Sequence, residues 1–568
     1  MGIPGHLRSL SVQARVALLV ALFALGGGIE ARAEKRTVCT VTVNSADERE
    51  VFRQRLPEGE YEFVELVERG RPDWLASACR QGVRCDLLLI SGHFDGMTEF
   101  YSDRLAQQES LPVAELERAS CSDSCPGVFS RLKEVYLFGC NTMNAEPLTS
   151  TSAEAERSLM RSGYTPADAQ RLTRVLNRRH AESSRDHMRR IFTNVPAIYG
   201  FSRLAPLGPT AATLLNRYFD SASPPDVGSG RPDPRLLGQF AASTMVVASG
   251  LTEADPDAAF RRETCQFVDE RLSPAAKLAF VHNLLRRDMA EARMFLDRIE
   301  RLYASFTEGE RQMPSFVAAQ AAIARDTKVS ERFLRFAADA DLPRTRARMI
   351  ELAGTLGWLS PGEQRAELVR MFGDLIGRGS IGPSEIDLAC ALNKDHRLDA
   401  ERSRLKLPPA QADKVNNAAA LACLGSATAR TRVLKALTSP YDADVELAQV
   451  YLRHRPITDV EELRLIANGI ARMPGSGAQV RALETLAQHR LSDSQTLNEL
   501  ARLFPSAASV DVQRAIAEVL IRGDYESIAK PEFVRVLSQN RRKSPDGTDI
   551  IDILIRRLRA DPPPKEQL

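Results

Sequence analysis

The hydrophobic pattern changes near residue 250, and this change constrains the fold more than any other feature of the chain. Before it, short apolar or β-branched runs alternate with segments of helical periodicity, whereas the later residues show helical periodicity alone. Alternation of helices with continuously apolar strands is typical of a mostly parallel sheet flanked by helices. We therefore expect an α/β domain over residues 34–250 and an α-helical repeat region over residues 251–568.

The α/β part divides into expected strands, helices and one loop. Five runs have the composition of buried strands, namely residues 37–43, 61–66, 86–90, 134–138 and 197–200. Helical periodicity marks residues 46–55, 73–79 and 111–119, and a longer insertion over about 153–192. Residues 221–234 are rich in proline, glycine and serine, which indicates a loop. Residues 243–249 are expected to form a last strand.

Signals for helix N-termini recur at regular spacing in the second part. A serine or threonine followed three residues later by glutamate or glutamine has the form of a capping box. Three such boxes and one further candidate cap occur: Thr458 with Glu461, Ser476 with Gln479, Ser492 with Gln495, and Ser509. Successive caps lie 16 to 18 residues apart, so a helix pair takes about 34 residues, the period of HEAT-like or tetratricopeptide-like arrays.

The first 33 residues have the three parts of a secretory signal peptide. Arg8 and Arg15 supply positive charge, residues 16–25 form an apolar run, and Ala31 and Ala33 offer a small-x-small cleavage site. A run of this length spans about 15 Å as a helix, half the thickness of a bilayer core. Cleavage after Ala33 is therefore favoured over a retained amphipathic anchor. We expect a bacterial protein of the periplasm or the exterior, with no stable membrane anchor.

The nine cysteines fit an oxidising compartment, which permits disulfides. Two pairs are close enough in sequence to form: Cys79 with Cys85, and Cys121 with Cys125. Cys390 and Cys423 lie in apolar helical segments, where buried free thiols are expected. Because nine is odd, full pairing leaves at least one thiol free. The CxxxC at Cys121 has no accompanying histidine or second cysteine pair, so we expect no metal.

Charge and motifs exclude several function classes. The formal net charge is +2, and the leader carries three arginines and one glutamate, so the remaining chain is formally neutral. A neutral chain has no bulk charge to attract a phosphate backbone, and we expect no nucleic-acid partner. Nucleotide-binding loops, serine-hydrolase elbows and zinc-protease motifs are missing from the sequence, so no cofactor is expected.

Two expected strand ends carry the residue types of a cysteine hydrolase. His93 lies shortly after residues 86–90, and Cys140 follows residues 134–138 through Gly139. Because functional groups gather at the carboxyl ends of parallel strands, neighbouring strands would bring the two side chains to one edge. A thiolate is a strong nucleophile, and a nearby imidazole collects its proton. The pair predicts acyl transfer from a peptide carbonyl through a thioester.

At these residues the chain resembles the caspase-like (clan CD) cysteine peptidases, which include caspases, legumains, gingipains and CHAT-domain proteases. In that family a histidine follows one core strand and the cysteine follows the next. His93 and Cys140 are 47 residues apart, close to the roughly 50 residues of caspases. The resemblance covers about residues 36–250. It departs from the family at Phe94, where glycine is common, and at residues 138–142, where the caspase signature is absent.

The residues and the resemblance together suggest a role for each residue at this edge. We expect Cys140 to be the nucleophile and His93 the general base and acid. The amide of Cys140 can point at a developing oxyanion, and the family adds the amide of the residue after the histidine, here Phe94. Asp95 is a candidate to orient His93, in the manner of the third member of a triad.

The family also places a strand beside the S1 pocket, at the position of residues 197–200. Phe201, Ser202 and Arg203 are therefore candidates for substrate contacts. We expect an exported cysteine peptidase acting on a protein or peptide, with the helical array binding substrate or a protein partner. One alternative is a non-catalytic periplasmic interaction scaffold with a degenerate caspase-like domain. Another is a sheet domain in which Cys140 forms a disulfide.

Overall fold

The structure is a computed structural model of the 568-residue chain. It separates into two compact units, Met1–Met313, here called the sheet unit, and Pro314–Leu568, here called the helical unit. The expected leader, residues 1–33, lies outside the described residues. The described residues are 34–66, 75–96, 98–103, 109–146, 152–180, 183–221, 225–474, 477–489, 491–524 and 531–559.

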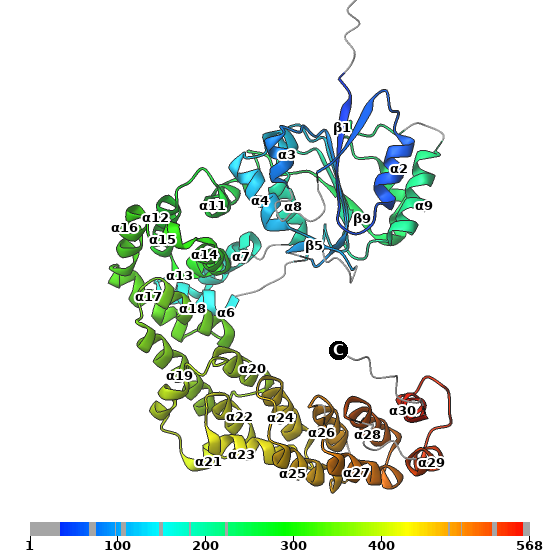
Figure 1. Ribbon diagram of the computed structural model, residues 1–568. Coiled ribbons are helices and arrows are strands. Elements are labelled where there is room, and N and C mark those ends of the chain that lie inside the picture. Colours follow the sequence, from blue (N-terminus) through cyan, green and yellow to red (C-terminus); the bar gives the residue numbers. More distant parts are fainter. Residues whose placement is uncertain are drawn as a thin grey trace, which may run out of the picture. The chain divides into compact units, whose positions relative to one another are not determined.

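The sheet unit is built on a six-stranded sheet with the order β2-β1-β3-β7-β8-β9 (Figure 1). Its strands are β1 (Arg36–Thr42), β2 (Tyr61–Glu65), β3 (Leu87–Ser91), β7 (Glu134–Phe138), β8 (Ala197–Phe201) and β9 (Met245–Ala248). The first five are parallel, and β9 runs antiparallel to β8. Every residue of β3, β7 and β8 is buried. The predicted strands and the mostly parallel α/β architecture are therefore confirmed.

Helices cover both faces of this sheet. They are α2 (Asp47–Arg55), α3 (Ala76–Arg80), α4 (Val113–Ser122), α5 (Pro126–Ser130), α8 (Ser184–Ile191), α9 (Gly208–Phe219) and α10 (Pro234–Gln239). Because successive strand residues point to opposite faces, Leu87 packs in the same cluster as Phe52 of α2, and Leu88 in the same cluster as Met188 of α8. Figure 1 shows α2 and α9 on one side of the sheet and α3, α4 and α8 on the other.

A second sheet of three short antiparallel strands follows directly after β3. Its strands are β4 (His93–Phe94), β5 (Glu99–Tyr101) and β6 (Ser110–Pro112), in that order. The sequence predicted a helix over residues 111–119, but the first two of these residues belong to β6. Pro112 takes an extended conformation at the N-cap, and the helix starts at Val113. This small sheet was missed because its strands are two or three residues long.

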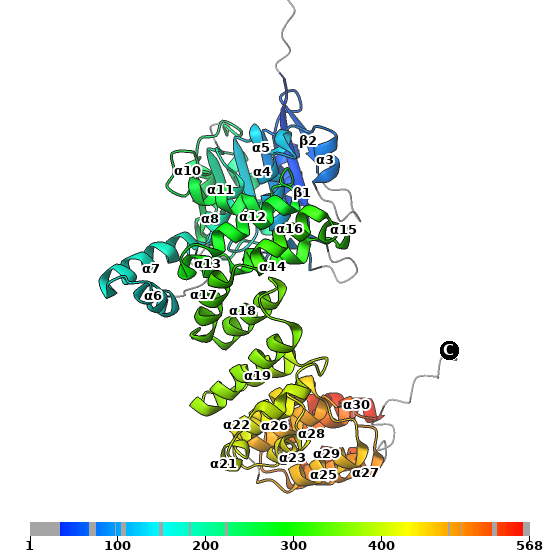
Figure 2. The same ribbon diagram turned by 90° about the vertical axis from the view of Figure 1, so that its left-hand side faces the viewer.

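The predicted helical insertion consists of α6 (Ser152–Arg161), α7 (Pro166–His180) and α8. Figure 2 shows α6 and α7 side by side. They pack against α13 (Met289–Met294) through a small cluster that includes Leu159 and Ala290. The insertion is therefore anchored to helices that follow the sheet in the sequence.

The expected disulfide pairing is wrong, although the expected free thiol is confirmed. Four disulfides are present: Cys39–Cys85, Cys79–Cys125, Cys121–Cys265 and Cys390–Cys423. The first three join residues that the sheet and its flanking helices bring together, whereas the sequence prediction used proximity along the chain. Cys390 and Cys423 are buried as predicted, but they face each other across α20 (Pro383–Leu392) and α22 (Val415–Cys423) and are bonded.

The compact sheet unit extends beyond the boundary near residue 250 that the sequence suggested. After β9 every regular element among the described residues is a helix, so the change in secondary structure is where it was expected. However, α11 (Ala258–Val268) packs on α4 and carries Cys265, which is bonded to Cys121. Helices α12 (Pro274–Leu285), α13, α14 (Leu296–Ser305) and α15 (Glu308–Arg311) also belong to this unit.

All regular elements described in the helical unit are helices. The main ones are α16 (Pro314–Ala324), α17 (Thr327–Ala338), α18 (Pro343–Thr355), α19 (Pro361–Arg378), α20, α22, α23 (Ala427–Ala436), α24 (Asp442–His454), α25 (Val460–Ala471), α26 (Gly477–Ala487), α27 (Ser494–Leu503), α28 (Val510–Arg522), α29 (Pro531–Asn540) and α30 (Ile550–Arg559). Alternate helices α20, α22, α24, α26, α28 and α30 pack in succession. The second half is thus a stack of helices, as expected. None of the described helices in either unit has the length and hydropathy of a membrane span.

Two of the predicted helix caps are displaced by one residue. Asp459 caps α25 and Asp493 caps α27, where the sequence indicated Thr458 and Ser492. In each case the aspartate carboxylate accepts the amide of the third helical residue, as a serine would. Ser509 caps α28 as predicted. Ser476 lies outside the described residues.

Candidate functional site

The structure places His93 and Cys140 at matching positions beyond two neighbouring strands. Strands β3 and β7 are paired in parallel, with Ser91 opposite Phe138. His93 and Cys140 each follow this pair by two residues. The amide of Gly92 donates to the carbonyl of Phe138 at 3.2 Å, so the pairing continues to the residue before His93. Because adjacent strands lie about 5 Å apart, both residues belong to one small region of the carboxyl edge.

Gly139 allows the two strand ends to touch. A Cβ atom at this position would lie 2.9 Å from the carbonyl oxygen of Gly92 and 2.9 Å from Cβ of Phe94. Both distances are shorter than van der Waals contact, so any larger residue would push the two loops apart. The glycine before the cysteine therefore serves close packing of the His93 and Cys140 segments.

Cys140 lies on a tight turn that is held by hydrogen bonds of the Thr142 hydroxyl. Asn141 has a φ of 59°, a left-handed conformation that asparagine tolerates better than most residues. The buried hydroxyl of Thr142 donates to the carbonyl of Gly139 at 3.0 Å and accepts the amide of Phe201 at 3.1 Å. These bonds hold the cysteine turn against the end of β8.

Cys140 is partly exposed, and its sulfur contacts a backbone donor. The amide of Ala205 donates to Cys140 Sγ at 3.3 Å, so the chain after β8 contacts the sulfur directly. All nine cysteines lie within the described ranges, and Cys140 is the one that remains a free thiol. The alternative in which Cys140 forms a disulfide is therefore wrong in this structure.

We expect alkylation to label one cysteine per chain. Iodoacetamide applied to the folded, unreduced protein should label Cys140 alone, because the other eight cysteines are in disulfides. Peptide mapping by mass spectrometry gives the modified residue, and Cys140→Ala is the control that should take up no label. Label on Cys390 or Cys423 in the unreduced protein would show that their disulfide is absent.

His93 is held by the small antiparallel sheet. It pairs with Tyr101 across β4 and β5, and the two ring centroids are 5.5 Å apart. Its Nε2 atom lies 3.2 Å from Oδ2 of Asp103. The sequence named Asp95 as the orienting carboxylate, but Oδ1 of Asp95 accepts the amides of Thr98 and Glu99 within its own turn. Asp103, ten residues beyond the histidine, is the carboxylate that the structure brings to the imidazole.

The two predicted oxyanion-hole residues differ in their surroundings. Within the described part of the chain, the Cys140 amide donates no hydrogen bond to another backbone group. The Phe94 side chain is buried, with its ring 4.7 Å from that of Phe100. Phe94 therefore contributes its side chain to the core beneath the site.

The three predicted substrate-contact residues differ in burial and in their hydrogen bonds. Phe201 is fully buried and packs against Phe138 and Phe240, so this candidate is wrong. Ser202 donates through both its amide and its hydroxyl to the carbonyl of Thr244, which joins the end of β8 to the residue before β9. Arg203 is exposed, and it alone of the three offers a side chain to a ligand.

Sequence reasoning missed a buried carboxyl group below this edge. Glu48 of α2 is only 4% exposed, and its Oε2 atom has no hydrogen-bond partner among the described residues. Burial raises the pKa of Glu48 to about 7, although hydrogen bonds from its own amide and from the Ser91 hydroxyl oppose that rise. Nothing in the sequence marks Glu48, because an acidic residue in the first turn of a helix is ordinary.

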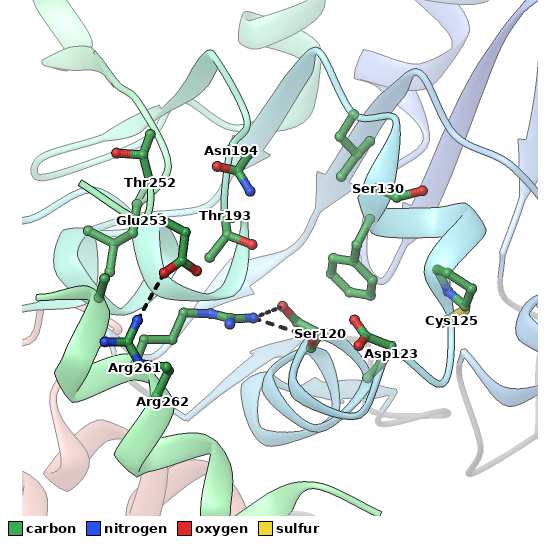
Figure 3. A pocket seen from close by; sticks show the side chains of 16 residues that line it. Ser120, Asp123, Cys125, Ser130, Thr193, Asn194, Thr252, Glu253, Arg261 and Arg262 are labelled. Carbon is green, nitrogen blue, oxygen red and sulfur yellow. Dashed lines mark hydrogen bonds and ion pairs between the residues drawn. The ribbon is translucent and has the colours of Figure 1, made fainter. Parts of the chain in front are cut away.

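A polar pocket of about 310 Å³ lies elsewhere in the sheet unit (Figure 3). It is formed around α4, α5 and α11, and neither His93 nor Cys140 lines it. Its arginines already have partners in the protein, since Arg261 donates to Ser120 and Arg262 pairs with Glu253. The pocket therefore does not extend the cysteine site.

Comparisons with known proteins do not identify a family. No protein-family model matches the chain, and no curated protein does. Among solved structures, a crystal structure of an engineered protein is 14% identical and covers 71% of this chain and 98% of its own. Its TM-score of 0.22 is too low to bear on the fold.

Proposed function

We propose that this protein is an exported cysteine peptidase with a caspase-like sheet domain, in which Cys140 and His93 form a catalytic dyad. The main support is the register of β3 and β7, because His93 and Cys140 each follow the last registered pair, Ser91 and Phe138, by two residues. The free state of Cys140 among eight bonded cysteines also supports it. The order of histidine and cysteine after successive strands of the main sheet agrees with the resemblance to clan CD.

The proposed reaction has two halves. The thiol of Cys140 gives its proton to His93 while the sulfur attacks the peptide carbonyl carbon, and the resulting oxyanion is stabilised by the Cys140 amide. The imidazolium then protonates the leaving amine, which departs and leaves a thioester. In the second half His93 takes a proton from water, the hydroxide attacks the thioester, and the thiol is released with the carboxylic acid product.

In this scheme Asp103 positions the imidazole. The contact of Asp103 with Nε2 leaves Nδ1 to exchange a proton with the sulfur. Because the Asp103 side chain is 68% exposed, its contact with the imidazole contributes little, of the order of 1 kcal/mol or less.

We therefore expect Asp103→Asn to lower kcat/KM by no more than about fivefold. Peptide hydrolysis followed over a range of ionic strengths measures this, and added salt should narrow the difference between the variant and the wild type. A fall of several hundredfold would mean that Asp103 takes a direct part in the chemistry, and the positioning role would have to be abandoned.

The helical unit is proposed to be a HEAT-like or tetratricopeptide-like array that binds substrate or a protein partner. The succession of contacts from α20 to α30 supports this view, because such stacks present extended concave surfaces. Export to the periplasm or the exterior is likewise proposed. The four disulfides are compatible with it, since such bonds persist in oxidising compartments.

A non-catalytic interaction scaffold is the second candidate function. One observation favours it, namely the buried phenyl ring of Phe94 at the position where the family commonly has glycine. Incubation of the full-length protein with a peptide library distinguishes the two functions. Hydrolysis that requires Cys140 supports the peptidase, and intact peptides at all times support the scaffold.

A further inference from the structure

The chain after β8 fixes one residue, Leu204, beside the sulfur of Cys140. The carbonyl of Arg203 accepts the amide of Asn141 at 2.6 Å, and the amide of Ala205 donates to Cys140 Sγ at 3.3 Å. Leu204 lies between these two contacts, so its backbone position relative to the nucleophile is set on both sides. Its side chain is nevertheless 74% exposed.

Leu204 and the nearby Leu207 are the two most exposed large apolar side chains among the described residues of the sheet unit, at 74% and 69%. A single exposed leucine is common on protein surfaces, but here two occur within four residues of the chain, and Leu204 is held next to the nucleophile. At the other member of the dyad, Tyr101 is 37% exposed and its ring lies beside that of His93. Exposed apolar surface thus borders both members of the dyad.

We propose that Leu204, Leu207 and Tyr101 form an apolar recognition surface that receives a large hydrophobic side chain of the substrate next to the scissile bond. The inference rests on the proposed peptidase function and adds its substrate class. A hydrophobic side chain laid on these residues would remove both partners from water, which is the main source of affinity at such surfaces. Arg203 could select a different substrate, because its exposed cation would favour an acidic side chain over a hydrophobic one.

Cleavage of a proteome-derived peptide library by the full-length protein tests this inference, with the cut sites read by mass spectrometry. We expect wild-type cuts next to leucine, phenylalanine, methionine or tyrosine. Leu204→Ser should lower kcat/KM for such peptides by about tenfold and change cleavage at small residues much less. Met160→Ser is the matched control, because Met160 is also an exposed apolar residue of the sheet unit, at 41%, but lies on α6 outside the proposed recognition surface. It should leave the cleavage pattern unaltered.

Three results would overturn the inference. Preferred cleavage beside aspartate or glutamate that is lost in Arg203→Gln would show that the cation selects the substrate, while the peptidase function would stand. An equal fall for all peptides in Leu204→Ser would show that the leucine holds the cysteine turn rather than the substrate. If no hydrolysis depends on Cys140, both the proposed function and this inference are wrong.

Discussion

Replacement of Cys140 by alanine is expected to reduce peptide hydrolysis to background, a fall of about 10⁴-fold or more in kcat. No other free thiol exists in the chain to replace the nucleophile, since the remaining eight cysteines are in disulfides. The measurement is the rate of product formation from a peptide library, compared between the wild type and the variant at equal protein concentration.

The control for this variant is its folded state. Cys140 lies at a partly exposed turn, so the alanine variant should keep the circular dichroism spectrum and unfolding midpoint of the wild type. Titration of thiols should fall from one per chain to none. Hydrolysis that continues unchanged in a folded Cys140→Ala variant would exclude this sulfur from the reaction.

Glu48 should make the sheet unit less stable as the pH rises. Its pKa is raised to about 7 in the folded state by burial, from an ordinary value of 4.5. Between these values the unfolded chain ionises Glu48 while the folded chain keeps it protonated, so stability is complete below pH 4.5 and falls as the pH rises through 7. The loss between pH 4.5 and pH 8 is expected to be about 3 kcal/mol.

Denaturant unfolding of the wild type and of Glu48→Gln over that pH range measures this effect. The variant should lack the loss of about 3 kcal/mol, so that its stability relative to the wild type rises steadily with pH. Glu58→Gln replaces an exposed glutamate just after α2 and serves as the matched control. Parallel curves for the wild type and Glu48→Gln would mean that the Glu48 carboxyl is not buried in solution.

The strands of the main sheet could be predicted from the sequence because each is a short run rich in apolar, β-branched or aromatic residues. Residues 134–138 are an example, since every one of them is buried in β7. The strands of the small sheet could not be predicted in this way. They have two or three residues each, and they exist because the chain after β3 folds back on itself, which local composition does not encode.

Disulfide pairing also depends on contacts that sequence proximity does not reveal. Cys39 and Cys85 are 46 residues apart in the chain, yet they meet because β1 and β3 are adjacent and parallel. Cys121 and Cys265 are 144 residues apart and meet where α11 packs on α4. The predicted pairs were nearest neighbours in sequence, whereas each of those four cysteines is bonded to one that is more distant in the chain.

The candidate site was predictable to the extent that it follows from strand ends. His93 and Cys140 could be named because each lies just beyond an apolar strand, and the parallel sheet brings such ends together. The roles of Asp103 and Leu204 could not be predicted from the sequence. Asp103 reaches the imidazole through the hairpin of β4 and β5, and Leu204 is placed by hydrogen bonds between two loops.

Trapping of the thioester tests the cooperation of sulfur and imidazole most directly. A peptide ester is turned over by the full-length protein, the reaction is quenched in acid within the steady state, and the protein is digested and mapped by mass spectrometry. The account predicts an added acyl group on the peptide that contains Cys140, with slower acylation in His93→Ala and none in Cys140→Ala. An acyl group found on another residue during turnover would contradict the account. An acylation rate that is the same in His93→Ala as in the wild type would also contradict it.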